Sequence, residues 1–310
     1  MSAMPSLLFT RPCLSSIRGS DALELVKLTT AEFEPIAKLV YYKTATHLPA
    51  EKLAMLSNRL RKRLRALKLD SFKAYYQIIQ SDEGCEEELP HFLSAVTTNE
   101  TYFFRNAQLW TFFREDLIPH FVATKGKIRA LRVWSAASSS GEEAYTTAIA
   151  LRESLPECDK WNISITGSDI SHRVLERARN GVYDDYAVAK MTPAQKKMWF
   201  IEREGAHQLK SEIKRMVKFV FHNLRDDFPH GRFDLIYLRN VLMYFDTAMK
   251  QRVLEVVSNA LAPQGYLIVG DVDPIRTTPE LNQSMTLEYR RPGAYQKPTT
   301  SSAAKALVQS

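Results

Sequence analysis

The stretch RVWSAASSSGEEAY, residues 132–145, decides the fold class. Its first three residues end an apolar run, Ile128 to Trp134, that has the length of a buried strand. The turn Ala136–Gly141 contains only Ala, Ser and Gly, and a helical stretch carrying Glu142 and Glu143 comes next. A strand, a short turn and a helix in direct succession form the basic unit of a doubly wound α/β sheet.

The same alternation continues toward the C-terminus. It predicts a second strand, ISITGSDI, ending near Asp169, a helix over Ser171–Arg179, a buried strand over Phe233–Asn240, a helix after Tyr244 and a strand over Tyr266–Val269. Residues 284–296 predict an antiparallel hairpin that turns at Pro292 and Gly293. We therefore predict an α/β domain over residues 129–296, followed by a disordered tail over 297–310.

The chain before the sheet has a different pattern. No glycine lies between Gly19 and Gly84, so residues 21–95 predict a small helical domain, with residues 96–128 as a linker. One helix is marked by leucines at helical spacing: Leu53, Leu56, Leu60, Leu64 and Leu67. Residues 1–20 predict a disordered leader, with a transit peptide as the alternative, because this stretch before Asp21 has arginines and serines but no acids.

The positive charge is concentrated on that helix. The chain has 42 Lys and Arg against 35 Asp and Glu, a net charge of +7. Residues 51–75 alone hold eight basic side chains against two acidic ones. One basic segment in an otherwise near-neutral chain predicts a local docking surface for an acidic partner. A solvated face of a bundle helix is the alternative.

Several classes are excluded by what the chain lacks. The three cysteines are far apart, and the seven histidines form no ligand pair at helical spacing, so neither a disulfide framework nor a metal site is expected. No apolar run approaches the roughly 18 residues of a membrane span. We expect a cytoplasmic protein without membrane insertion.

The residues after the strands predict the ligand. Parallel sheets bind ligands beyond the carboxyl ends of their strands. The small-residue turn permits close approach to the backbone, but the chain has no GxGxxG there, which disfavours a pyrophosphate. Asp169, at the end of the second strand, is suitably placed to accept hydrogen bonds from both hydroxyls of a ribose. S-adenosylmethionine, an adenosine ligand without pyrophosphate, fits this pattern.

Four stretches resemble the chemotaxis receptor glutamate O-methyltransferases, the CheR family. They are TTNETYFFR (97–105), RVWSAASSSGEEAY (132–145), GSDIS with VLERARNGVY (167–183) and FDLIYLRNVLMYF (233–245), and the basic segment NRLRKRLRALKLDSF is similar to that family's N-terminal domain. The resemblance implies a class I, Rossmann-like methyltransferase sheet, a helical N-terminal domain and a small β subdomain at about 203–220. It also implies methyl transfer from S-adenosylmethionine to glutamates on the cytoplasmic coiled coil of chemoreceptors.

The resemblance also implies the site residues. The expected cofactor-binding residues are Asn99, Thr101, Arg105, Glu143, Asp169, Asn223, Leu224, Arg239 and Asn240. Arg105 and Tyr244 are expected to be catalytic, and Arg59, Arg61, Lys62 and Arg65 to dock the receptor. A glutamate of reference pKa about 4.3 is already ionised at neutral pH, so we expect Arg105 and Tyr244 to orient the reactants without transferring a proton.

The chain departs from the family at two places. Ile201–Met216 has one glycine where many members have a glycine-rich hairpin that binds a receptor C-terminal peptide, so we expect this chain not to depend on the pentapeptide tether. We also expect a monomer. Gly270–Ile275 replaces the usual His-Ser-Glu, which leaves the role of this loop open. Two alternative functions remain. A nucleic-acid methyltransferase is disfavoured by the absence of adjacent prolines, and a non-catalytic cofactor-sensing adaptor by the intact site residues.

Overall fold

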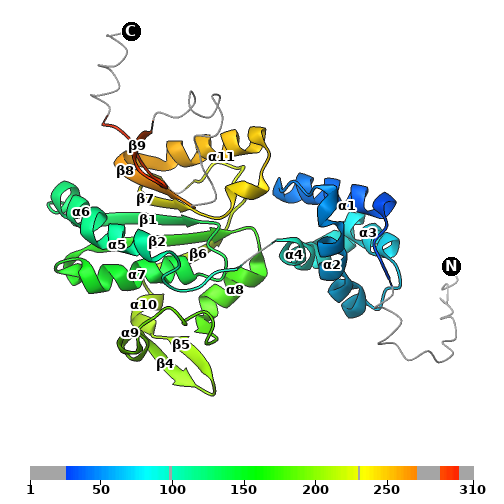
Figure 1. Ribbon diagram of the computed structural model, residues 1–310, viewed down its shortest axis with the longest axis horizontal. Helices are drawn as coiled ribbons and strands as arrows, with labels where there is room; N and C mark the ends of the chain where they lie inside the picture. Colours follow the sequence, from blue (N-terminus) through cyan, green and yellow to red (C-terminus); the bar gives the residue numbers. More distant parts are fainter. Residues whose placement is uncertain (1–25, 98–99, 230, 271–286, 300–310) are drawn as a thin grey trace, which may run out of the picture.

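The computed structural model describes residues 26–97, 100–229, 231–270 and 287–299. Two bodies are visible in Figure 1, a group of N-terminal helices and a larger sheet with helices on both faces. The helical group contains α1 (Thr30–Thr44), η2 (Ala50–Lys52), α2 (Leu53–Leu67), α3 (Phe72–Gln80) and α4 (Asp82–Val96).

Helix α2 confirms the helix predicted from the leucine spacing. Leu56, Leu60 and Leu64 are fully buried, while Leu53 and Leu67 at the two ends are half-buried. These leucines pack against the other three helices in a core of their own, distinct from the two cores that flank the sheet. The basic side chains of α2 therefore project from a helix whose orientation is fixed by burial on its opposite face.

Residues 96–128, predicted only as a linker, contain further helices: α5 (Ala107–Phe112), the π-helical turn η3 (Phe113–Leu117) and α6 (Ile118–Lys125). Their aromatic residues, among them Trp110 and Phe113, pack with α7 (Glu142–Ser154) in the core on one face of the sheet. Helix α11 (Thr247–Ala260) covers the other face. Figure 1 shows α11 and α7 on opposite sides of the strands.

The large sheet has seven strands in the order β6-β2-β1-β7-β8-β10-β9. The strands are β1 (Ala130–Ala136), β2 (Asn162–Asp169), β6 (Val217–Phe221), β7 (Phe233–Leu238), β8 (Leu261–Val269), β9 (Glu288–Arg291) and β10 (Ala294–Gln296). The first five are parallel, and β9 and β10 form the predicted antiparallel hairpin at one edge. This arrangement confirms the predicted doubly wound sheet.

The predicted ends of two strands were wrong. The strand predicted from Ile128 begins at Ala130, because Ile128 lies in a turn and is 73% exposed. Strand β8 begins at Leu261, five residues before the predicted Tyr266, because a register shift lets Leu261 pair with Phe233. The helix predicted over 171–179 is α8 (His172–Asn180), with Ser171 at its N-cap position.

A second, three-stranded antiparallel sheet lies below α7 and α8 in Figure 1, in the order β3-β5-β4. Its strands are β3 (Val182–Tyr183), β4 (Phe200–Arg203) and β5 (Ala206–Leu209), accompanied by α9 (Pro193–Trp199) and α10 (Ser211–Lys214). The predicted subdomain at about 203–220 began and ended too late, because β3 and β4 begin at Val182 and Phe200 and residues 217–221 form β6 of the large sheet.

The two bodies are joined by polar contacts at the end of α1. Tyr41 donates a hydrogen bond of 2.7 Å to Asp246, Arg225 donates one of 2.9 Å to the Tyr42 carbonyl, and Asn223 donates one of 3.2 Å to the Lys43 carbonyl. These bonds hold the helical group against the loops that follow β6 and β7. Among the described residues, no helix is long and apolar enough to cross a membrane.

Candidate active site

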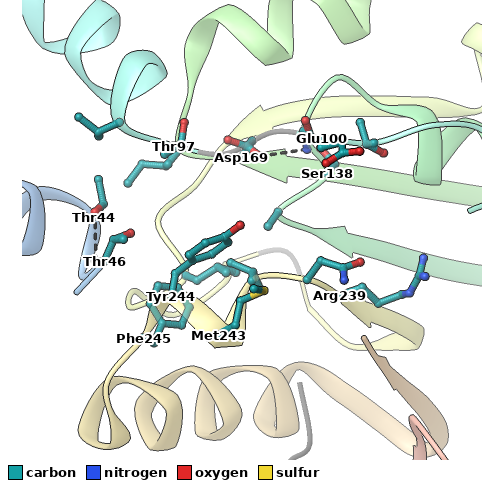
Figure 2. Close-up of a pocket in the computed structure, with 18 of the residues that line it drawn as sticks. Thr44, Thr46, Thr97, Glu100, Ser138, Asp169, Arg239, Met243, Tyr244 and Phe245 are labelled. Atoms are coloured by element: carbon teal, nitrogen blue, oxygen red, sulfur yellow. Dashed lines mark hydrogen bonds between the residues drawn. The ribbon is translucent and has the colours of Figure 1, made fainter. Parts of the chain in front are cut away.

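A cavity of about 640 Å³ lies at the carboxyl ends of β1, β2 and β7, between the sheet and the helical group. Its volume is in the range of cavities that enclose a cofactor-sized molecule. The loops after the three strands line one part of it, and Thr44, residues 46–49, Lys52, Met55 and Arg59 of the helical group line another. Figure 2 shows side chains from both bodies facing this space.

The turn after β1 contains the small residues that were predicted to let a ligand approach the backbone. Ala137, Ser139 and Gly141 have positive φ values of 64°, 50° and 92°, and the turn leads directly into the first residues of α7. Ala137, Ser138 and Ser139 line the cavity. Alternating left-handed residues direct successive backbone N–H groups to one side, which suits an acceptor group.

Two glycines of this region, Gly141 and Gly167, are required by packing in the core. A Cβ at Gly141 would lie 2.8 Å from Cζ of Phe219, and one at Gly167 would lie 2.5 Å from Cε1 of the same ring. Phe219 belongs to β6 and packs in the core on the α7 side of the sheet. The glycines are therefore required by packing behind the turn, whereas the serines and alanines face the cavity.

Asp169 is the buried carboxylate of the site. Its Oδ2 accepts a hydrogen bond of 2.9 Å from the Ser139 backbone, and its Oδ1 accepts one of 2.9 Å from the Ser171 backbone (Figure 2 shows the first). Burial raises the pKa of Asp169 to about 6, although these backbone N–H groups lower it. Each oxygen keeps lone pairs that remain available for a second donor.

Glu143 and Arg239 form a buried ion pair in the cavity wall. Nη1 of Arg239 donates 2.8 Å to Oε2 of Glu143, and the side chains are only 6% and 13% exposed. Ser135 donates 2.7 Å to Oε1. Helix α7 and the end of β7 thus jointly hold one carboxylate at the base of the cavity.

Arg105 is held by its own loop. Nη1 donates 2.6 Å to the Glu100 carbonyl, and the guanidinium lies 5.7 Å from the ring centre of Tyr102. The flanking Phe104 and Asn106 have positive φ values of 55° and 68°. Trp110 donates 3.0 Å to the Arg105 carbonyl, so the strained loop is anchored to α5.

Tyr244 belongs to the 3-10 turn η5 (Leu242–Tyr244), which follows β7. Its carbonyl accepts a hydrogen bond of 2.9 Å from the His47 backbone, and Phe245 forms a β-bridge with Thr46. In Figure 2 its ring extends into the cavity, with its hydroxyl directed to the side of Asp169 and Thr97. The helical group therefore positions the turn that carries this tyrosine.

The cavity brings together the predicted site residues that the structure describes. Its lining includes Thr101, Arg105, Glu143, Asp169, Asn223, Leu224, Arg239, Asn240 and Tyr244. Asn99 and most of the Gly270–Ile275 loop lie outside the described residues.

The four predicted docking residues separate into two groups. Arg59 lines the cavity, and its Nη1 donates 3.0 Å and 3.3 Å to the carbonyls of Val96 and Thr97. Arg61, Lys62 and Arg65 lie outside the cavity, and Lys62 and Arg65 are exposed. The geometry thus gives Arg59 a contact with the end of α4 that the sequence did not predict.

The sequence did not reveal the wall made by residues 44–49, nor the contributions of Glu100, Tyr102, His222 and Met243. Residues 44–49 contain no motif; they reach the cavity because Ala45 adopts a left-handed conformation (φ 57°) that ends α1. Glu100 and Tyr102 lie within the quoted stretch 97–105, whose position beside predicted site residues was the available signal.

Comparisons with known proteins match both bodies. The family model described as "CheR methyltransferase, SAM binding domain" matches residues 99–290, and "CheR methyltransferase, all-alpha domain" matches residues 31–97. The chain is 34% identical over 266 residues to the chemotaxis protein methyltransferase of Escherichia coli K12, covering 84% of this chain and 90% of that protein.

Two further relatives give similar values. The chain is 30% identical over 280 residues to the chemotaxis protein methyltransferase of Borreliella burgdorferi, covering 88% of this chain and 96% of that protein. It is 31% identical over 237 residues to a probable chemotaxis protein methyltransferase of Rhizobium etli, covering 75% and 88%. The similarity thus extends through the helical group and the sheet.

Proposed function

The chain belongs to the CheR methyltransferase family, and on that premise we propose that it transfers the methyl group of S-adenosylmethionine to glutamate side chains of chemoreceptors, forming methyl esters. One observation carries the proposal. A single cavity at the carboxyl ends of the strands combines a buried carboxylate, a held arginine and a projecting tyrosine, and opens beside a basic helix.

The cavity fits S-adenosylmethionine. Its volume of about 640 Å³ is sufficient, and the turn after β1 presents backbone rather than bulky side chains. Asp169 would accept hydrogen bonds from the ribose hydroxyls, using the lone pairs that its two hydrogen bonds from the backbone do not occupy. Asn223 and Leu224 would flank the adenine, and Glu143, steadied by Arg239, would bind the methionyl amino group.

The remaining predicted residues would complete the binding surface. Thr101 and Arg105, with Asn99 of the same loop, would border the methionyl end, and Asn240 would follow Arg239 along the wall. When bound, the cofactor supplies an electrophilic methyl group on a positively charged sulfur. A glutamate carboxylate is already ionised at neutral pH, so the chain has no proton to remove.

The residues of this chain would therefore act by positioning. Arg105 would hold the incoming carboxylate, and Tyr244 would fix the reacting end of the cofactor from the opposite wall. Opposite charges are neutralised in the transition state, so enclosure between the sheet and the helical group would lower the cost of reorganising water.

The partner would be the acid-rich coiled coil in the cytoplasmic part of a chemoreceptor, and the enzyme would then act in the cytoplasm. Lys62 and Arg65 are exposed on α2, whose apolar face is buried, and their positive charge would attract acidic helices. We propose a monomeric enzyme. The strands β4 and β5 have four residues each with a turn at Glu204 and Gly205, and this short hairpin supports independence from a receptor peptide tether.

The test is transfer of radiolabelled methyl from S-adenosylmethionine to purified receptor cytoplasmic fragments, with and without their C-terminal peptide. We expect base-labile label on the receptor, lost in Arg105→Ala and equal for both fragments. Label on nucleic acid, or none on any receptor, would contradict the function. Label that requires the peptide would contradict tether independence alone.

Docking is tested separately with Lys62→Gln and Arg65→Gln together. We expect a higher KM for the receptor, with the difference greatest at low salt, and an unchanged Kd for S-adenosylhomocysteine. Arg59→Gln provides the contrast, because Arg59 also holds the chain at Val96 and Thr97 beside the cavity. A receptor KM that does not respond to the double substitution would contradict docking by α2.

A further inference from the structure

The cavity lining includes exposed residues of opposite charge, Lys52 and Glu100, which mark its mouth. Lys52 and Arg59 of the helical group carry positive charge. Glu100 belongs to a second group that we call the rim cluster: Glu100, Tyr102 and Tyr186. Glu100 is exposed, Tyr186 is 57% exposed, and Glu100 and Tyr102 line the cavity.

The rim cluster is built from two distant segments. The Tyr186 hydroxyl donates 2.8 Å to Oε1 of Glu100, and the rings of Tyr102 and Tyr186 meet edge to face with their centres 6.1 Å apart. The loop after β3 is also joined to this segment by the Phe103 backbone, which donates 2.9 Å to the Ala187 carbonyl. The Glu100 carboxylate is thus held in place at the mouth instead of moving freely in solvent.

This acid lies close to the residue that would receive the substrate. Arg105 donates to the backbone carbonyl of Glu100 and packs over Tyr102, so the rim cluster and Arg105 form one unit. A carboxylate held by Arg105 would therefore lie near Glu100. A fixed negative charge there attracts no carboxylate, so its effect falls on whatever else the receptor helix brings to the mouth.

The following inference rests on the proposed function. We propose that Glu100, held by Tyr186, is a specificity-determining residue: it selects receptor glutamates whose helical neighbour facing the rim cluster is uncharged. A helix lying across the mouth directs its acidic face toward α2 and a face without carboxylates toward the rim cluster. The preferred substrate segment is therefore an amphipathic helix with an amide or apolar residue one turn from the target glutamate.

The test compares pairs of receptor fragments that have the same target glutamate. The two fragments of a pair differ only at one residue, three or four positions before or after the target. This residue is glutamine in one fragment and glutamate in the other. The measured quantity is the ratio of kcat/KM for the glutamine fragment to that for the glutamate fragment. Wild type is expected to prefer glutamine at one of these positions by about fivefold, the effect of one like-charge pair about 4 Å apart in near-bulk water.

Glu100→Gln is expected to bring this ratio to about 1, and raising the salt concentration should do the same in wild type. Glu115→Gln is the matched control, because Glu115 is an exposed acid in η3 outside the cavity, and its ratio should equal that of wild type. Tyr186→Phe keeps the ring but releases the carboxylate, so it should lower the ratio in part.

The outcomes are distinguishable. Wild type that methylates fragments with equal efficiency at every position, or a preference that Glu100→Gln leaves intact, overturns the selectivity and leaves the proposed function standing. An unchanged ratio in Tyr186→Phe overturns the role of its hydrogen bond. Wild type that methylates no fragment overturns the proposed function itself.

Discussion

Replacing Asp169 by asparagine tests the ribose assignment most directly. The carboxylate accepts one backbone N–H on each oxygen, and ribose hydroxyls would bind the same oxygens. Hydrogen bonds to a charged group contribute about 1.5–3 kcal/mol each. An asparagine also presents an NH2 group to one of the two backbone donors. We expect Asp169→Asn to weaken S-adenosylhomocysteine binding by at least about 100-fold, measured by isothermal titration calorimetry.

The pKa of Asp169 adds a second signature. Burial raises it to about 6, so wild-type affinity should be constant above about pH 7 and fall about tenfold per pH unit below 6, as the carboxylate takes up a proton. Asp169→Asn should lose this dependence. Asp70→Asn, at an exposed acid of the helical group, is the control for the charge change. Binding within threefold of wild type in Asp169→Asn would refute the reasoning.

Three further predictions concern stability. Arg63→Leu should lower the free energy of unfolding in urea by about 3 kcal/mol, because Arg63 binds the buried Glu88 through two hydrogen bonds of 2.8 and 2.7 Å; a loss below about 0.5 kcal/mol would show that the pair is dispensable. Gly167→Ala should cost about 1–3 kcal/mol because its Cβ would meet the Phe219 ring, and Phe219→Leu should recover part of that loss in the double variant; simple additivity would argue against the clash. Burial raises the pKa of Glu142 to about 7, so the folded state holds a proton that the unfolded state releases, and stability should fall by about 3 kcal/mol between pH 4.5 and 7; Glu142→Gln should flatten this slope, and an equal slope in both would contradict it.

The sequence predicted the parts of the molecule that periodicity and motifs encode. The α2 leucines, the strand that ends at Asp169 and the small-residue turn all depend on local spacing, and the structure has each of them. The two wrong strand ends have a common cause. The residues that begin β1 and β8 are fixed by pairing with β2 and β7, which no local pattern contains.

What the sequence could not predict depends on contacts between distant segments. Glu143 and Arg239 are 96 residues apart, and Glu100 and Tyr186 are 86 apart, so neither pair has a local signal. The wall formed by residues 44–49 depends on how the helical group rests against the loops after β6 and β7. The packing of Gly141 and Gly167 against Phe219 of β6 likewise depends on a distant segment and has no local signal.

The cavity is shared by two bodies, and this has a thermodynamic consequence. A molecule bound there touches residues 44–49 and the strand ends together, so its binding energy opposes separation of the bodies as well as unfolding of either one. Without ligand, the helical group is held by hydrogen bonds around Asp246, Asn223 and Arg225, by the bridge between Thr46 and Phe245, and by apolar packing of Ala45 and Ile170. Saturating cofactor should thus stabilise the helical group and the sheet together against thermal unfolding.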